Sequence, residues 1–138
     1  MVSNYSIKLS TKGFCDIHDI TGPVEESVSK SGVSNGMVNI FCPGSTGGLT
    51  TLEYEPGLQK DLPELMEKLI PSNKSYEHDK TWGDGNGFSH LRSAMIGPSL
   101  TLPVVAGKTR HGTWQQIVFL CFDNRSRDRE LVITVMGE

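Results

Sequence analysis

The chain has 138 residues, a length typical of one domain, and its 36% hydrophobic and 21% charged residues are ordinary for a soluble globular protein. Thirteen basic against sixteen acidic residues give a formal net charge of -3, which excludes the strongly basic footprint of a general nucleic-acid-binding protein. A small phosphorylated ligand needs only a local positive site and is compatible with this balance.

Cysteine usage and hydropathy indicate the compartment. Cys15, Cys42 and Cys121 form no CxxC motif, and an odd, unpaired set is typical of a reducing environment. No stretch approaches the roughly 20 apolar residues needed to cross a bilayer, and the first ten residues lack the apolar segment of a secretory signal. We therefore expect one cytoplasmic domain over residues 1–138, not bound to membranes, with its thiols buried.

The first elements are a strand pair and a helix. Polar and apolar residues alternate over Tyr5–Leu9, the period of a half-buried strand, and Phe14–Ile17 is a second short strand candidate. A helix is predicted over Pro23–Ser31, because proline suits a first helical turn and Gly32 is a typical C-terminal stop.

Two strands and a second helix follow. Gly36–Pro43 is apolar at successive positions, which predicts a strand buried on both faces, and Leu49–Tyr54 is predicted as the next strand. Asp61 with Glu64 resembles a capping box. The helix that it begins has one apolar stripe, formed by Leu62, Leu65, Met66 and Leu69, and ends at Pro71.

Tyr76–His90, YEHDKTWGDGNGFSH, has little apolar periodicity. We predict an ordered surface loop, because long polar segments inside compact domains are usually functional and the aromatic residues argue against disorder. The loop would present five polar side chains: His78, Asp79, Asp84, Asn86 and His90.

The C-terminal third is predicted to be all strand. Ser99–Val105 is expected to be an edge strand, and Thr113–Phe122 is a continuous apolar run typical of a central strand. Asp123–Arg129 is predicted as a charged turn that leads into a hairpin partner, Leu131–Met136. The arginines of the turn, Arg125, Arg127 and Arg129, would be solvated or, alternatively, would bind phosphate. These elements predict an α+β fold, a single sheet-rich domain with two short helices.

His78 and His90 are the strongest candidates for chemistry. Neutral imidazoles bind zinc and similar ions, and Asp79, Asp84 or Glu53 are the carboxylates that would complete such a site. The spacing of the two histidines matches no compact metal motif. A metal site, a metal-free acid/base pair and two solvated histidines therefore all stay open.

Two further segments have functional and structural interpretations. Residues 43–50, PGSTGGLT, form a turn whose backbone N–H groups are suited to an anion, or simply a tight turn between strands. In a strand over residues 112–116, GTWQQ, Thr113 and Gln115 would share one face, toward a pocket or toward the core.

Together these motifs resemble the YjbQ-like family, whose members are often labelled secondary thiamine-phosphate synthases, and especially its archaeal and thermophilic branch. The resemblance covers nearly the whole chain from about Phe14 to Glu138. The motifs that carry it, in order, are PGSTGGLTTLEYEPGL, LPELMEKLIP, YEHD, GNGFSHLRSAMIGPSLTLPV and GTWQQI.

The resemblance implies a sandwich or barrel-like α+β core and a homotrimer with sites near the subunit interfaces. It implies a phosphorylated small molecule as substrate and a divalent ion, zinc or magnesium, as cofactor; a non-catalytic trimeric binding module is the alternative. By position, the resemblance places the family's polar cluster on His78, His90, Glu53 and Gln115. We expect His78 and His90 to be the metal ligands, Glu53, Asp79 and Gln115 the catalytic residues, and Ser45, Thr46, Asn86 and Thr113 the substrate contacts. Many members carry a histidine where this chain has Gly44.

Overall fold

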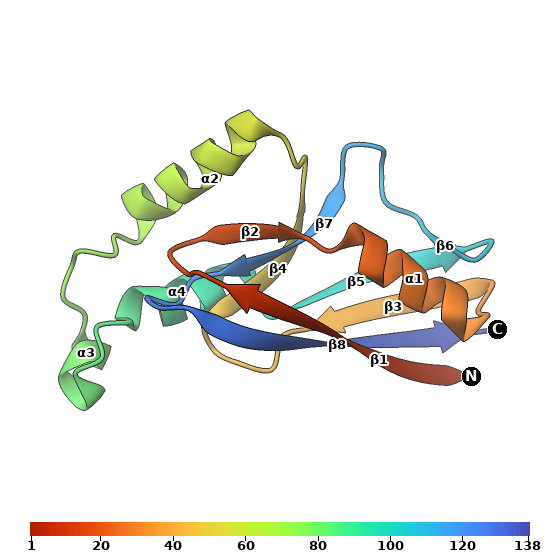
Figure 1. Ribbon diagram of the computed structural model, residues 1–138, viewed down its shortest axis with the longest axis horizontal. Helices are drawn as coiled ribbons and strands as arrows, with labels where there is room; N and C mark the ends of the chain where they lie inside the picture. Colours follow the sequence, from red (N-terminus) through yellow and green to blue (C-terminus); the bar gives the residue numbers. More distant parts are fainter.

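Two antiparallel sheets and four helices make up the computed structural model of the chain, which describes residues 1–138 (Figure 1). The strands are β1 (Val2–Thr11), β2 (Asp16–Asp19), β3 (Asn35–Phe41), β4 (Gly47–Leu52), β5 (Ser99–Val105), β6 (Lys108–Thr109), β7 (Gln116–Cys121) and β8 (Arg127–Gly137). The helices are α1 (Thr21–Ser31), α2 (Pro56–Leu69), α3 (Glu77–Trp82) and α4 (Gly87–Ile96). The predicted α+β class is confirmed, whereas the prediction of only two helices is wrong.

The larger sheet has the strand order β1-β8-β3-β5-β6 and the smaller one the order β2-β7-β4. The two sheets curl into a half-barrel, and a core of 17 buried residues lies between them. Strand β8 supplies Leu131, Ile133 and Val135 to this core, and β7 supplies Ile117 and Phe119 from the opposite sheet. The period of two along β8 directs alternate side chains into the core.

Strand β7 is covered on both faces, which explains its continuous apolar sequence. Ile117, Phe119 and Cys121 face the larger sheet, while Val118 and Leu120 belong to a second cluster on the other side. That cluster also includes Met66 of α2 and side chains of α4 and β4. The prediction of a central strand here is confirmed.

Two strand predictions are wrong for the same reason, the split into two sheets. Strand β7 does not pair with β8; β8 instead pairs with β1 and β3 in the larger sheet. Strand β3 is buried on one face only, at Val38 and Ile40, while Met37 and Phe41 are exposed. No helix or strand covers that outer face of the larger sheet.

The helices begin and end at residues with clear local causes. Helix α1 ends at Gly32, which has a left-handed φ of 72°, as predicted. Helix α2 begins at Pro56 rather than near Asp61, because the Glu55 carboxylate accepts hydrogen bonds from the N–H groups of Gly57 and Leu58. Pro63 therefore lies inside the helix. No helix of the chain combines the length and apolarity that a bilayer-spanning segment needs.

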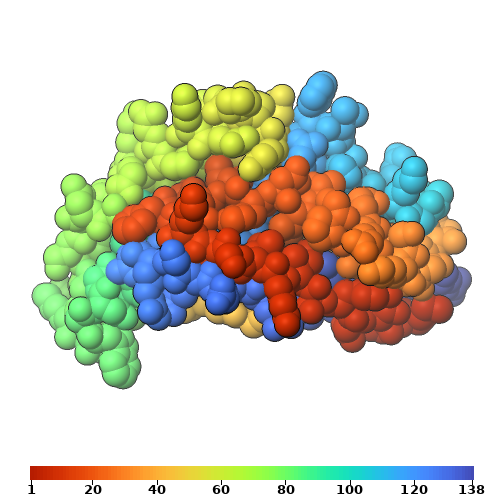
Figure 2. All heavy atoms as spheres, viewed as in Figure 1, coloured from red at the N-terminus to blue at the C-terminus, as the bar shows by residue number.

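The predicted loop over Tyr76–His90 is wrong, because it contains α3 and the start of α4. Helix α3 has no buried residue and lies at the outer edge of the molecule (green in Figure 2), so its sequence carries no apolar periodicity. The helix is instead fixed by its ends: the Asp79 carboxylate accepts a hydrogen bond from Tyr76 N–H, and Gly83 ends the helix with a φ of 71°.

A buried arginine fastens this region to the rest of the molecule. Arg92 of α4 is fully buried and donates from Nε and Nη2 to the Ile70 carbonyl, at 3.1 and 2.9 Å, at the end of α2. Its Nη2 also contacts the Glu67 carboxylate at 2.6 Å, and its guanidinium lies 4.8 Å from the Phe88 ring centroid. These contacts therefore hold the two ends of the segment between Ile70 and Arg92 next to each other.

We predict that Arg92→Met lowers the free energy of unfolding by about 2–3 kcal/mol, because the Ile70 carbonyl and the Glu67 carboxylate lose buried donors while the volume is kept. Urea denaturation would measure the change. Lys30→Gln, which removes the solvent-exposed Lys30–Glu26 ion pair, is the control and should leave the midpoint unchanged. An Arg92 variant as stable as this control would contradict the assigned role.

Candidate functional site

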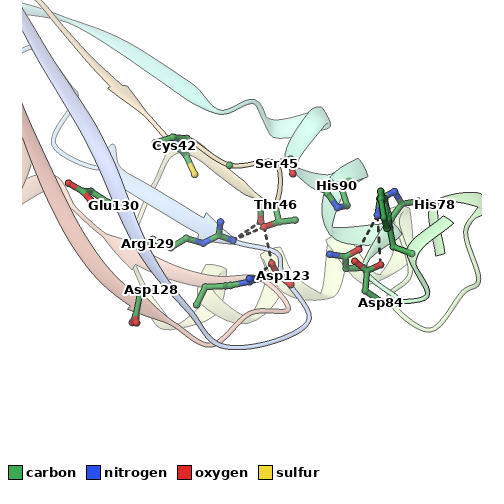
Figure 3. A pocket seen from close by; sticks show the side chains of 15 residues that line it. Cys42, Ser45, Thr46, His78, Asp84, His90, Asp123, Asp128, Arg129 and Glu130 are labelled. Atoms are coloured by element: carbon green, nitrogen blue, oxygen red, sulfur yellow. Dashed lines mark hydrogen bonds and ion pairs between the residues drawn. The ribbon is translucent and has the colours of Figure 1, made fainter. Parts of the chain in front are cut away.

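A polar cavity of about 510 Å³ lies at one end of the core, where α3, α4, the turn before β4 and the start of β8 meet (Figure 3). Only two of its fifteen lining residues are hydrophobic. The lining comprises Cys42, Pro43, Gly44, Ser45, Thr46, His78, Trp82, Asp84, Asn86, His90, Asp123, Arg127, Asp128, Arg129 and Glu130.

Two arginines continue the inward face of β8 beyond the core. The inward positions Leu131, Ile133 and Val135 are followed toward the start of the strand by Arg129 and Arg127. Arg127 is neutralised by Asp123, whose Oδ2 lies 2.8 Å from the arginine Nε. The predicted solvated turn is therefore wrong at these positions, because the residues form one wall of a cavity.

Arg129 is the cation in this cavity that no carboxylate pairs with; it takes part in none of the chain's seven ion pairs. Its Nη2 donates to Thr46 Oγ1 at 2.8 Å and to Cys121 Sγ at 3.2 Å, and its guanidinium lies 5.8 Å from the Phe119 ring centroid. Its Nε is buried without a partner. The guanidinium is thus held in place by neutral groups and keeps its full charge.

Thr46 and Asp123 form the support for that guanidinium. The buried Thr46 hydroxyl donates to Asp123 Oδ2 at 3.1 Å while it accepts from Arg129. Burial alone would raise the pKa of Asp123, but hydrogen bonds from Arg127, Asn124 N–H and Thr46 hold it below its ordinary value. Thr46 therefore orients Arg129, and its own hydroxyl is already engaged on both sides.

The turn beside Arg129 is open. Ser45 is exposed, and its hydroxyl makes no hydrogen bond within the chain. A Cβ atom added at Gly44 would lie 3.3 Å from Arg129 Nη1. We expected many relatives to carry a histidine at this position. The Cβ atom of such a histidine would lie directly in front of the Arg129 guanidinium, so glycine leaves the guanidinium accessible.

His78 and His90 meet across α3 and α4, with ring centroids 4.4 Å apart. His78 Nε2 lies 3.2 Å from Asn86 Oδ1 and 3.9 Å from Asp84 Oδ1. Burial lowers the pKa of His90, and the nearby His78 lowers it further. His90 is therefore neutral at physiological pH and available as a proton acceptor.

Asp79 does not line the cavity. Its carboxylate accepts hydrogen bonds from the backbone N–H groups of Tyr76 and Gly87, both at 2.9 Å, and the donor at Tyr76 is the larger cause of its lowered pKa. The side chain thereby ties the start of α3 to the start of α4. Its position gives it a part in placing His78 and His90, and its predicted catalytic role stays a prediction.

Three other predicted site residues lie outside the cavity. Glu53 follows the end of β4, and Thr113 and Gln115 lie in the turn before β7 rather than in a strand. The prediction that the last two share a strand face is wrong, because Gln115 Oε1 bonds back to Gly112 N–H at 2.8 Å and holds the turn. Within one chain these three residues do not line the cavity that contains His78 and His90. Their functional roles stay predictions.

The side chains as placed do not fit a three-ligand metal site. No group of three or more His, Cys, Asp and Glu side chains is arranged to hold a metal ion. Catalytic zinc sites take three protein ligands, and here only His78 and His90 lie close together, with the nearest carboxylate, Asp84, 3.9 Å from His78 Nε2.

The fold and the cavity define a small, single-domain α+β protein whose two curled sheets carry a polar pocket at one end. The family model described as "UPF0047 protein YjbQ-like" matches residues 5–138, so the chain belongs to the YjbQ-like UPF0047 family. The resemblance seen in the sequence motifs is thereby confirmed.

Relatives from archaea and bacteria support this assignment. A UPF0047 protein of Archaeoglobus fulgidus is 38% identical over 130 residues, which cover 94% of this chain and 98% of the relative. The UPF0047 protein YugU of Bacillus subtilis is 31% identical over 134 residues, which cover 96% and 98%.

Solved structures share the fold over its full length. A YbjQ-like protein of unknown function from Sulfolobus solfataricus superimposes with a TM-score of 0.90 at 29% identity and 100% coverage of both chains. A hypothetical protein from Aeropyrum pernix gives a TM-score of 0.91 at 32% identity, with 99% of each chain covered.

The low pKa of His90 predicts a loss of stability on mild acidification. The unfolded chain takes up a proton near the ordinary pKa of 6.5, before the native state does, so the free energy of unfolding should fall as pH drops below about 6.5. Asp79 and Asp123 affect stability in a separate, more acidic pH range. The stabilisation that comes from their lowered pKa is lost only near and below the ordinary aspartate pKa of 3.8.

His90→Gln should flatten this dependence between pH 7 and 5, because glutamine does not titrate. Urea unfolding at a series of pH values would measure both slopes, and an NMR titration would place the His90 midpoint directly. Equal slopes for the two proteins would contradict the assigned environment of His90.

Proposed function

We propose that the cavity binds a phosphorylated small molecule and that His78 and His90 move protons on it. The observation that carries the proposal is Arg129, a guanidinium held by Thr46 and Cys121 with no carboxylate partner. Planar guanidinium groups suit the oxygens of a phosphate. A guanidinium at a cavity wall that has no carboxylate partner can bind an anion without first breaking an ion pair.

The other groups of the cavity fit the same ligand. Gly44 leaves room in front of Arg129 Nη1, and Ser45 next to it has a free hydroxyl for a phosphate oxygen. His90 is kept neutral by burial, so it accepts a proton, and His78, beside the Asn86 amide, is placed to relay or return one. Thr46 acts through Arg129 rather than by direct contact.

The finer chemistry that we propose is weak thiamine-phosphate synthesis, in which a phosphorylated thiazole displaces pyrophosphate from an aminopyrimidine diphosphate. Arg129 would hold a phosphoryl oxygen of one substrate while the thiazole ring nitrogen forms the new C–N bond and the C–O bond to pyrophosphate breaks; this displacement itself releases no proton. The departing pyrophosphate needs a counter-charge that a single guanidinium supplies only in part, so this activity would be slow. The alternative is a binding module that retains its ligand, or a metal ion on His78 and His90, without turnover.

Arg129→Gln tests the proposal because glutamine keeps a polar side chain and loses the charge. We expect isothermal titration calorimetry with glycerol 3-phosphate to show at least a tenfold loss of affinity, the size of a lost charge-assisted bond pair. Any thiamine phosphate formed from the two purified precursors should fall in parallel.

Arg110→Gln, at an exposed arginine remote from the cavity, is the matched control. Unchanged affinity in Arg129→Gln would reject the anion site. Retained anion binding, together with failure of the unaltered protein to form thiamine phosphate or to complement a thiamine auxotroph, would leave the binding-module alternative.

We further propose that the protein works as a homotrimer whose contacts include the outer face of the larger sheet. On that face Met37 pairs across strands with Met136, and Phe41 with Val132, and all four side chains are exposed. Apolar pairs on an uncovered sheet face are typical of a buried interface.

The trimer predicts a solution mass about three times the 15.1 kDa of the chain, measured by light scattering after size-exclusion chromatography. The double variant Met37→Glu with Met136→Glu should shift the mass to one chain, since it places adjacent negative charges on the apolar face. Leu65→Glu on the exposed side of α2 is the control and should keep the trimer mass. A monomeric unaltered protein would reject the assembly.

A further inference from the structure

The charges of the cavity are not those of a site for a simple polyanion. Asp123 is cancelled by Arg127. Three carboxylates then remain, those of Asp84, Asp128 and Glu130, against the single guanidinium of Arg129. A phosphate monoester brings a further charge of about -1.5 to -2, so the ligand alone would leave the cavity strongly negative.

One surplus carboxylate, that of Asp84, and the anion site lie at different ends of the cavity. In Figure 3, Arg129 is on one side of Thr46, and Asp84 is on the other, next to the histidines. The Asp84 side chain is 48% exposed and no group of the chain lies within hydrogen-bonding distance of its carboxylate; His78 Nε2, at 3.9 Å, is too far away. The cavity therefore has a positive end and a negative end.

An aromatic surface accompanies the negative end. Trp82, the last residue of α3, lines the cavity although its side chain is 76% exposed. It gains nothing from core packing, since α3 has no buried residue. Asp84, whose one ion-pair partner is His78 at 3.9 Å, lines the same cavity. An indole face and a carboxylate in one cavity are the combination that recognises quaternary or protonated nitrogen, through the ring quadrupole and the charge.

We propose that the ligand of this cavity carries a fixed positive charge in addition to its phosphate, and that Trp82 and Asp84 recognise this cation while Arg129 holds the phosphate. The inference rests on the proposed function, because it assigns the second end of the same ligand. It explains why the wall of an anion site includes surplus carboxylates, and why a six-residue helix holds a tryptophan at the mouth.

Two probes that share a phosphate monoester test the inference: phosphocholine, which carries a quaternary ammonium group, and glycerol 3-phosphate, which does not. Calorimetric titration of the full chain should give about tenfold tighter binding of phosphocholine, within the range of a cation–π contact combined with an ion pair. Trp82→Ala and Asp84→Asn should each erase most of this preference and leave the affinity for glycerol 3-phosphate within twofold.

Glu77→Gln is the matched control, because it removes one negative charge from the same helix outside the cavity, where Glu77 contacts only Lys80. The preference should survive in this variant. If glycerol 3-phosphate binds as tightly as phosphocholine, or if the preference persists in both cavity variants, the inference is overturned while the anion site stands. If neither ester binds, the anion site and this inference both fall.

Discussion

The alternation of side chains along β8 is the constraint on which the rest of the structure depends. This strand lies between β1 and β3, and its inward positions supply Leu131, Ile133 and Val135 to the core. The same alternation continues past the edge of the core and delivers Arg129 and Arg127 to the cavity wall. The packing of the core and the lining of the cavity are thus set by one register, and a slip of one residue would exchange both faces at once.

The sequence predicts the parts of the fold that rest on burial. The continuous apolar run predicted β7 correctly, because that strand is buried on both faces. Gly32 predicted the end of α1 correctly, because the backbone there needs the left-handed conformation that glycine favours. Helix α3 could not be found in this way, because it buries nothing and is fixed by the Asp79 carboxylate and by Gly83. The early start of α2 was missed because Glu55, an unusual capping residue, replaces the expected Asp61.

The sequence predicted only part of the candidate site. His78, His90 and Asn86 were recognisable as polar side chains without a packing role, and the structure brings them together with Ser45 and Thr46.

Arg129 entered only as the alternative, a phosphate contact of the turn, because charged residues around Asp123–Arg129 look like an exposed turn. The signal was present in the period of two of Leu131–Met136, which, extended by one step, points Arg129 inward. The opposite error concerns Glu53, Thr113 and Gln115, which were predicted as site residues but do not line the cavity. The order of motifs along a chain does not say which residues share a cavity.

The contacts of Arg92 fix both ends of the segment that carries α3 and the start of α4. Because Arg92 binds the Ile70 carbonyl, the intervening segment starts and ends at nearly the same point in space. The entropy of closing such a segment grows only slowly with its length. Insertions or deletions in the exposed parts of this segment that keep His78, Asn86 and His90 would alter the mouth of the cavity without moving a strand, so a single sheet scaffold can be fitted with different mouths.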